Sequence, residues 1–431
     1  MSTRAFVGAV VCASVVLVAA FAGEAATRTD ADVARSDVNV YQGYAARVVG
    51  GELPYRDFAI EYPPGALPMF LLPAVTTSTS GASWAPLNAP ARRYARAFEV
   101  LVLVLSIATI ALSGSSLLAL KRPAGPVVMA LALLALSPLL LGDVFPARYD
   151  ILPAALTAAA VALALRGHHA VGGALLGFGA AAKLYPVLLV PSLAIVAARQ
   201  RGARAAIWCV ISAAAGAAAV FAPFAIMSWR GTWGAVRVQF QGGLQIESVV
   251  SSLLVAASHL GRALRALGLP PPAPLTNRAT EAGLSRSILV GAGLDQTALL
   301  MTALFACTLV WLWYRLSRSR ADPREDLVHA AASTLAVVLV LGTVLSPQYL
   351  IWLLPLVALV GGKRGALATT TFAVAALLTR FWFPSGYIDF ENGLDGDAGA
   401  LLLARNLALV VTALVLVLPS GHSSWSRSQR S

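Results

Sequence analysis

The sequence has little charge and few cysteines. Only 12% of its 431 residues are charged, whereas 58% are hydrophobic. A soluble chain of this length could not hide so much apolar surface in its core, so we expect an integral membrane protein. The three cysteines, Cys12, Cys209 and Cys307, all lie in apolar runs. They support neither a disulfide framework nor a thiolate metal site.

Motifs for nucleotides and metals are also missing. No Walker motif, dinucleotide fingerprint or Asp-x-Asp pair stands in a cytoplasmic loop, and the five histidines lack the spacing of metal ligands. These absences disfavour a soluble nucleotide-sugar donor, and no metal or other cofactor is expected. The net charge of +12 lies in short basic clusters between apolar runs, so we expect no nucleic-acid partner.

Apolar runs of nearly the length needed to cross a bilayer recur along the chain. They predict an all-α integral membrane protein, a single membrane domain over residues 1–431 with about 10–13 transmembrane helices. Short runs near 170–198 and 348–360 are expected to be tilted, broken or re-entrant helices. The runs lie near residues 5–23, 96–120, 125–142, 150–166, 170–182, 184–198, 205–226, 293–315, 327–345, 348–360, 365–383 and 401–419.

Basic clusters all fall on one side of this alternation, which predicts that this side is cytoplasmic. The termini would then be cytoplasmic, and two long connections, residues 24–95 and 227–292, would lie outside the plasma membrane. The first run ends in AFAGEAA, which also fits a signal-peptide cleavage site, but a retained helix fits the even number of runs better. The clusters are Arg4, Lys121 with Arg122, Arg166, Arg199 to Arg204, Arg315 to Arg324, Lys363 with Arg364, and Arg427 with Arg430.

The first outer loop combines a short helix signal with a proline-rich segment. Ser36 or Asp37 can cap a helix that ends at Gly50 and Gly51. The segment LPYRDFAIEYPPG that follows is expected to be non-helical, and both elements would lie at the membrane surface. The acidic stretch DFENGLDGDAG, residues 389–399, lacks the register of a calcium loop and is expected to be a solvated outer loop.

Asp37 has two interpretations. Its carboxylate can accept hydrogen bonds from backbone N–H groups as a helix cap. It can also serve as a general base, because an apolar surface disfavours the charged form and raises the basicity of a carboxylate. Asp57 and Glu61 are rival candidates for that role, whereas Asp30 and Asp32 look like solvated loop charges.

Lys183 is embedded in an apolar region, where a cation requires a partner. It could hold a phosphate, or it could pair with a helix carbonyl or with an acid such as Asp150. Arg148, at an outer helix start, could likewise bind phosphate or anchor the helix by pairing with an acid.

Seven short segments follow one another along the chain: DVNVY (37–41), GGELPY (50–55), EYPP (61–64), RYDILP (148–153), AAKLYP (181–186), LQIES (244–248) and SPQYLIW (346–352). As an ordered set, they resemble the actinobacterial polyprenol-phosphate-mannose-dependent mannosyltransferases of the C-type glycosyltransferase (GT-C) fold. The resemblance implies a multi-helix bundle with a large first outer loop carrying short interfacial helices, Asp37 as catalytic base, and a lipid-phosphate sugar as donor.

The predicted activity is that of an inverting hexosyltransferase, mannosyltransferase-like, which moves a sugar from a polyprenyl-phosphate-linked donor to an envelope glycolipid or glycan on the outer face. Lys183 and Arg148 would bind the donor phosphate. A multi-spanning transporter or lipid flippase of envelope precursors is the alternative, although the two halves of the chain show no repeat; a non-catalytic scaffold is a third. Further substrate contacts are expected from Tyr41, Tyr55, Asp57, Glu61, Tyr62, Asp150, Tyr185, Gln245, Glu247, Gln348 and Tyr349.

Overall fold

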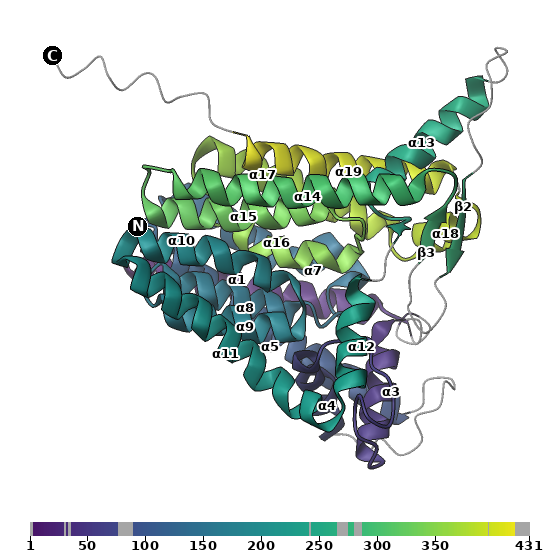
Figure 1. Cartoon of the computed structure of the whole chain (residues 1–431), viewed down its shortest axis with the longest axis horizontal. Coiled ribbons are helices and arrows are strands. Elements are labelled where there is room, and N and C mark those ends of the chain that lie inside the picture. Colours follow the sequence, from purple (N-terminus) through teal and green to yellow (C-terminus); the bar gives the residue numbers. More distant parts are fainter. Residues whose placement is uncertain are drawn as a thin grey trace.

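The chain folds into a bundle of helices with one small antiparallel sheet among the described residues (Figure 1). The computed structural model describes residues 3–29, 32, 36–75, 89–240, 243–264, 275–279, 287–394 and 396–418. Asp30 and Asp395, and the predicted basic residues Arg427 and Arg430, lie outside these ranges. The predicted fold class, an all-helical integral membrane protein, is confirmed.

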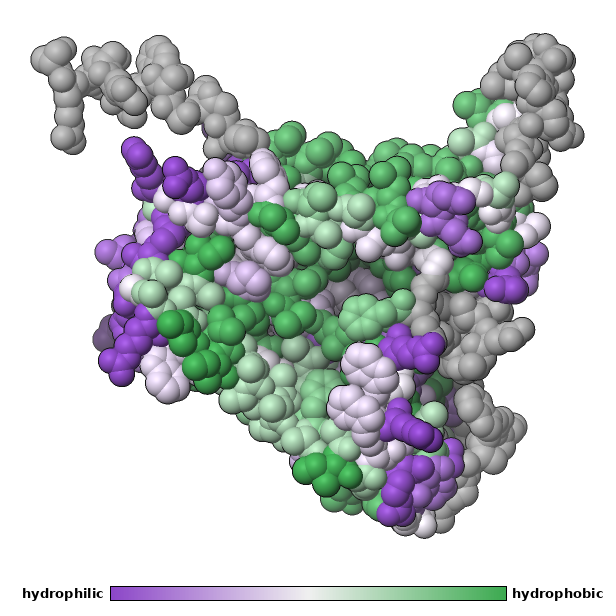
Figure 2. All heavy atoms as spheres, in the orientation of Figure 1, coloured by the Kyte–Doolittle hydropathy of each residue, from purple (hydrophilic) through white to green (hydrophobic). Residues whose placement is uncertain are grey.

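Long apolar helices form the frame of the bundle. The described residues contain six that could cross a membrane: α1 (Thr3–Thr27), α5 (Ala89–Ala119), α11 (Ala203–Met227), α14 (Leu294–Ser317), α17 (Gly362–Trp382) and α19 (Gly396–Val417). A bent pair, α6 (Ala124–Ala135) and α7 (Ser137–Leu141), gives a seventh if it is counted as one span; its two parts meet at 54°. Figure 2 shows hydrophobic residues over the middle of the bundle and hydrophilic residues gathered at its two ends.

The remaining helices of the bundle are α8 (Ile151–Ala164), α9 (His169–Ala182), α10 (Val190–Arg201), α15 (Pro323–Leu341) and α16 (Leu350–Val357). Every apolar run predicted from the sequence lies on one or more of the bundle helices. The number of helices that cross the bilayer stays a prediction. All residues of the short helix α16 are buried, so protein covers its ends, as a broken segment in a membrane requires.

Small residues bring α9 and α11 into close contact. A Cβ atom added at Gly173 would overlap the carbonyl oxygen of Cys209, and one at Gly177 would overlap that of Ala213. From the other side, a Cβ atom at Gly216 would overlap the carbonyl of Ala174. Helices inside a membrane associate through such close backbone packing, because lipid provides no hydrophobic driving force between them.

The basic clusters meet at one end of the bundle. Arg122 donates to the Glu325 carboxylate and to the Leu359 carbonyl oxygen at 2.8 Å. Arg199, in the last turn of α10, pairs with Asp326 at 2.7 Å. Helix α15 begins at this end, and α9 begins beside it, where the ring of its first residue contacts a side chain of α10. Both helices run from here toward the opposite end.

Ion pairs fix the end of α1 to the bundle. Glu24 is 4% exposed and pairs with Arg380 of α17 at 2.5 Å. Arg28 pairs with Glu99 of α5 at 2.6 Å and with Asp143, just after α7, at 3.2 Å. These contacts tie the first apolar run to α5, α17 and the turn after α7.

The first long connection is docked on the bundle. Its helix α3 (Asp37–Val49) follows the predicted signal, and a non-helical stretch leads to the 3₁₀ turn η1 (Pro64–Ala66) and to α4 (Leu67–Val75). Tyr41 and Ala45 of α3 are fully buried. Gly65 lies against the backbone of Ala181 and Ala182 so closely that a Cβ atom would overlap it. The proline-rich loop is therefore pressed onto the end of α9.

The second long connection contains α12 (Trp229–Phe240), β1 (Leu244–Gln245), α13 (Val249–Leu264), β2 (Thr276–Ala279) and β3 (Ser287–Val290). Strand β3 is central and antiparallel to both neighbours: Leu289 pairs with Leu244 on one side and with Asn277 on the other. Helix α18 (Ser385–Gly393) packs beside this sheet, with Phe390 fully buried. The expectation of a solvated loop at 389–393 was wrong, because these residues continue a helix whose apolar side is covered.

The glycine contact between α9 and α11 gives a first testable prediction. We expect Gly177→Ala to lower the free energy of unfolding by roughly 1–3 kcal/mol, because the added methyl group must push two backbones apart. Thermal unfolding in detergent micelles measures the change. Gly8→Ala in α1 is the matched control, since a Cβ atom there meets nothing within 4 Å. Equal melting temperatures for the two variants would contradict the packing.

Candidate active site

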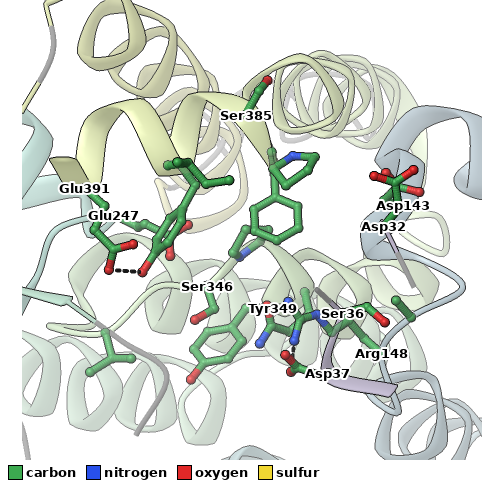
Figure 3. Close-up of a pocket in the computed structure, with 18 of the residues that line it drawn as sticks. Asp32, Ser36, Asp37, Asp143, Arg148, Glu247, Ser346, Tyr349, Ser385 and Glu391 are labelled. Atoms are coloured by element: carbon green, nitrogen blue, oxygen red, sulfur yellow. Dashed lines mark hydrogen bonds and ion pairs between the residues drawn. The ribbon is translucent and has the colours of Figure 1, made fainter. Parts of the chain in front are cut away.

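A cavity of about 700 Å³ opens at the end of the bundle opposite the basic clusters. Segments from both long connections and from the ends of several helices line it, as the close-up in Figure 3 shows. Many of its polar residues were predicted from the sequence. The charged and polar lining includes Asp37, Glu61, Arg148, Lys183, Gln239, Glu247, Ser346, Gln348, Tyr387 and Glu391.

Asp37 and Arg148 form an ion pair on the cavity wall (Figure 3). Asp37 is the first residue of α3, while Ser36 occupies the N-cap position with an extended backbone. The Arg148 guanidinium binds Asp37 Oδ2, and the Tyr41 hydroxyl donates to the same oxygen at 3.4 Å. Both charged side chains are largely buried, 16% and 12% exposed. The carboxylate is therefore held by a cation from another element of the fold.

Arg148 remains charged in this environment. Burial lowers the pKa of its guanidinium to about 10, against the opposing effect of Asp150 and Glu247. Its Nε atom has no hydrogen-bond partner among the described residues. A buried cation with an unused donor, facing a cavity, can accept an additional anionic ligand.

Lys183 lies in a cage of one acid and three aromatic rings. Its Nζ atom is 2.9 Å from Asp150 Oδ1. The same atom lies 4.9 Å from the ring centroid of Tyr149, 5.3 Å from that of Tyr349 and 5.4 Å from that of Trp352. The predicted pair with Asp150 is present, and the lysine also lines the cavity. Cation–π contacts hold an ammonium group without neutralising it.

The aromatic part of this cage is itself stacked. Tyr185 and Trp352 lie with centroids 4.3 Å apart, and Trp352 and Tyr349 with centroids 3.8 Å apart. The Trp352 indole N–H donates to Asp150 Oδ1 at 2.7 Å. Asp150 is 1% exposed and thus lies behind the cavity wall, where it orients Lys183.

Local sequence explains why Lys183 faces the cavity. Helix α9 ends at Ala182, and Lys183 has an extended backbone with its N–H bonded to the Gly179 carbonyl. The Tyr149 hydroxyl donates to the Ala182 carbonyl at 3.3 Å, and Gly65 covers the same backbone. The helix end is thus held from two sides, which fixes the start of the lysine side chain.

Glu247 occupies another part of the cavity wall. It follows β1, and Gln245 donates to its Oε2 at 3.1 Å and to the Ser346 hydroxyl at 3.3 Å. The Leu345 N–H donates to Gln245 Oε1 at 2.9 Å. Burial raises the pKa of the Glu247 carboxyl to about 8, although Arg405 and other cations nearby oppose this shift. At neutral pH the carboxyl group is therefore largely protonated.

Several cavity residues were missed by the sequence analysis, and Asp32, expected to be a solvated loop charge, also lines the cavity. Tyr387 and Glu391 lie on one face of α18, and the Tyr387 hydroxyl donates to Glu391 Oε1 at 3.2 Å. Ser287 of β3 donates to the same oxygen. The spacing of four between a tyrosine and a glutamate was the available signal, because it places both on one face once the segment is helical.

Asp57 and Tyr55 are among the predicted residues that do not line the cavity. Asp57 is exposed, pairs with Arg56 at 2.8 Å and accepts from the Leu53 N–H. The Arg56 guanidinium lowers the pKa of Asp57, which makes it a weak base. Tyr55 is buried against Phe224, with its hydroxyl bonded to a backbone carbonyl.

The other predicted side chains lie in the wall or just behind it. Glu61, Tyr62, Gln348 and Tyr349 belong to the lining. Tyr41 donates a hydrogen bond from its hydroxyl group to the lining residue Asp37. Gln245 donates to the lining residues Glu247 and Ser346. Tyr185 stacks on Trp352, which in turn stacks on the lining residue Tyr349.

Comparison with known proteins gives one family. The family model of glycosyltransferase family 87 matches residues 60–347, about two thirds of the chain. No curated protein matches the chain. The matched region contains Arg148, Lys183 and Glu247, whereas Asp37 and Glu391 lie outside it.

The raised pKa of Glu247 predicts a loss of stability with rising pH. The folded chain holds this proton more tightly than the unfolded one, so the stabilisation is complete below the ordinary value of 4.5 and is lost as the pH rises through about 8. We expect the melting temperature to fall by several degrees between about pH 6 and pH 9, and by less in Glu247→Gln. Exposed Glu52→Gln is the control. Identical pH profiles for Glu247→Gln and the native protein would show that the carboxyl is ionised throughout.

Proposed function

The chain belongs to glycosyltransferase family 87, and on that premise we propose that it moves a hexose, namely mannose, from a polyprenyl-phosphate donor to an envelope glycolipid or glycan. As a multi-pass membrane protein of a glycosyltransferase family, it is a transferase that acts on a sugar donor and an acceptor. The family favours this reading over a transporter or flippase. The observation that carries the proposal is one cavity in which two cations face a carboxylate, at the end of an apolar bundle.

The two cations suit the phosphate of the donor. Arg148 and Lys183 both line the cavity, and each has a carboxylate partner already. A guanidinium binds phosphate through two parallel hydrogen bonds, and an ammonium group acts as a compact point charge. Together they would stabilise the negative charge that builds on the departing polyprenyl phosphate.

The ion pair of Arg148 with Asp37 links donor binding to the base. While the ion pair is intact, the Asp37 carboxylate is bound to the Arg148 guanidinium and cannot accept a proton from the acceptor hydroxyl. A phosphate that binds Arg148 competes with the carboxylate for its N–H donors, and this competition frees Asp37 Oδ2. Asp37 is then free to act as a base only when the donor is bound.

The proposed reaction is a single displacement. The acceptor hydroxyl oxygen forms a bond to the anomeric carbon as the bond from that carbon to the phosphate oxygen breaks, and the phosphate leaves with the electron pair. Asp37 takes the proton of the hydroxyl. Attack from the face opposite the phosphate inverts the configuration at the anomeric carbon, and no covalent intermediate is formed.

The location of the cavity fits a donor that cannot leave the membrane. It lies at the bundle end opposite the basic clusters. Basic residues concentrate on the cytoplasmic side of membrane proteins, so we place the cavity on the outer face of the plasma membrane and both termini inside. There a lipid-linked sugar can present its head group directly to the site.

Asp37 is tested against the neighbouring acids of the first outer segment. We expect Asp37→Asn to reduce sugar transfer by about 10²–10⁴-fold, the usual contribution of a general base. The assay incubates membranes containing each variant with radiolabelled polyprenyl-phosphate mannose and measures label in extracted glycolipids and glycans.

Asp57→Asn is the matched control, because Asp57 is exposed and lies outside the cavity lining, and it should retain native activity. Glu61→Gln tests the remaining rival, since Glu61 does line the cavity. Full activity of Asp37→Asn, with loss in Glu61→Gln, would move the base to Glu61.

Lys183 is tested with its partner removed at the same time. The single variant Lys183→Gln leaves Asp150 buried and unpaired, which alone destabilises a protein by about 3–5 kcal/mol. The double variant Lys183→Gln, Asp150→Asn leaves no charge unpaired, so it should keep a near-native melting temperature. We expect its donor KM to rise at least about tenfold, since a phosphate contact is lost. A native donor KM in a stable double variant would make Lys183 a purely structural residue.

A further inference from the structure

One part of the cavity is not used by the proposed transfer step. Glu247 and Glu391 lie together on the other side of the cavity from Asp37 and Arg148 (Figure 3). Tyr387, which donates to Glu391, also lines the cavity. Glu247 comes from the segment after β1, and Glu391 and Tyr387 come from α18. Two acids and a phenol from separate elements thus face the same space.

Glu247 has an unused oxygen. The residue is 2% exposed, its Oε2 accepts from Gln245, and its Oε1 has no hydrogen-bond partner among the described residues. A buried polar atom that makes no hydrogen bond destabilises the folded protein. Such an atom therefore calls for an explanation, and a ligand that supplies the missing hydrogen bond is one. Since Glu247 lines the cavity, a ligand in the cavity can supply that partner.

The backbone of Glu247 is fixed from behind. Its carbonyl oxygen accepts from Arg405 Nη2 at 3.1 Å and from Asn406 Nδ2 at 3.2 Å, both from α19. Asn406 also donates to the Ser252 hydroxyl at 2.9 Å. Arg405 and Asn406 are fully buried. The carboxyl group is therefore held in position before any ligand arrives, as a binding group should be.

The chemistry of this part selects an uncharged ligand rich in hydroxyl groups. A protonated carboxyl can donate to one hydroxyl and accept from another, and the second acid accepts from a further one. Phe383 and Tyr387 also belong to the lining, and aromatic rings pack on the C–H faces of sugars. An anionic group here would face the Glu391 carboxylate, so it would be repelled.

We propose that Glu247 and Glu391 form the acceptor subsite, which binds an uncharged sugar or polyol head group and discriminates against acceptors that carry a phosphate or carboxylate there. The inference rests on the proposed transferase function and deepens it. The cavity then has two ends of opposite character: cations for the donor phosphate, and acids for the hydroxyls of a neutral acceptor.

Steady-state kinetics separate the two ends. With radiolabelled polyprenyl-phosphate mannose as donor and an alkyl mannoside as acceptor, we expect Glu247→Gln and Glu391→Gln each to raise the acceptor KM about tenfold, the worth of one hydrogen bond to a sugar hydroxyl. The donor KM should change less than about twofold, since the donor phosphate binds elsewhere. Asp57→Asn is the control for both constants.

Charge discrimination is measured with a second acceptor. The native protein should use the alkyl mannoside at least about tenfold more efficiently than the same compound carrying a phosphate on its sugar, and the double variant Glu247→Gln, Glu391→Gln should lose most of this preference. A merely structural role would lower kcat or stability and leave the preference intact, which would overturn the proposal. Equal use of both acceptors by the native protein would overturn it as well.

Equilibrium binding distinguishes failure of the subsite from failure of the proposed function. Binding of the alkyl mannoside to the purified native protein and to Glu247→Gln needs no donor and no transfer. If the native protein transfers no sugar but binds the alkyl mannoside more tightly than the variant, the subsite stands and the proposed reaction is wrong. If transfer occurs and the two proteins bind the alkyl mannoside equally, the subsite is wrong.

Discussion

Buried charges at one end of an apolar bundle must be paired, and this requirement organises the site. Arg148 and Asp150 stand two residues apart, just before α8, and each pairs with a partner from a different element: Asp37 of α3 and Lys183 at the end of α9. Breaking either pair would leave an uncompensated buried charge, which is strongly unfavourable. The two ion pairs therefore fix the positions of α3, α8 and α9 relative to one another around the cavity.

The same pairing gives the site its chemical capacity. Lys183 is stabilised by aromatic faces as well as by Asp150, so its charge is available to a second anion. Arg148 shares its charge with Asp37 at the cavity wall, where the phosphate of the proposed donor would compete with the carboxylate.

The sequence predicted the helices well, because the length and composition of an apolar run are local properties. It also identified Asp37, Arg148, Lys183 and Glu247, since charge and amide groups in an otherwise apolar chain are conspicuous. Which charges pair was left open: the alternative of an Arg148 anchor did not specify Asp37 as its partner. Asp57 has the same side chain as Asp37, and only the tertiary structure, which exposes Asp57 beside Arg56, distinguishes the two.

The sequence by itself determined that the chain lies in a membrane, where its helices run, and which polar residues need a partner there, because these follow from transfer energies along the chain. The tertiary structure alone decided the shape of the cavity and its second acidic side. Glu391 looked like part of a solvated acidic loop, and only the packing of α18 against the small sheet brings it and Tyr387 to the cavity beside Glu247. Such a juxtaposition depends on contacts between segments far apart in sequence, which no local pattern records.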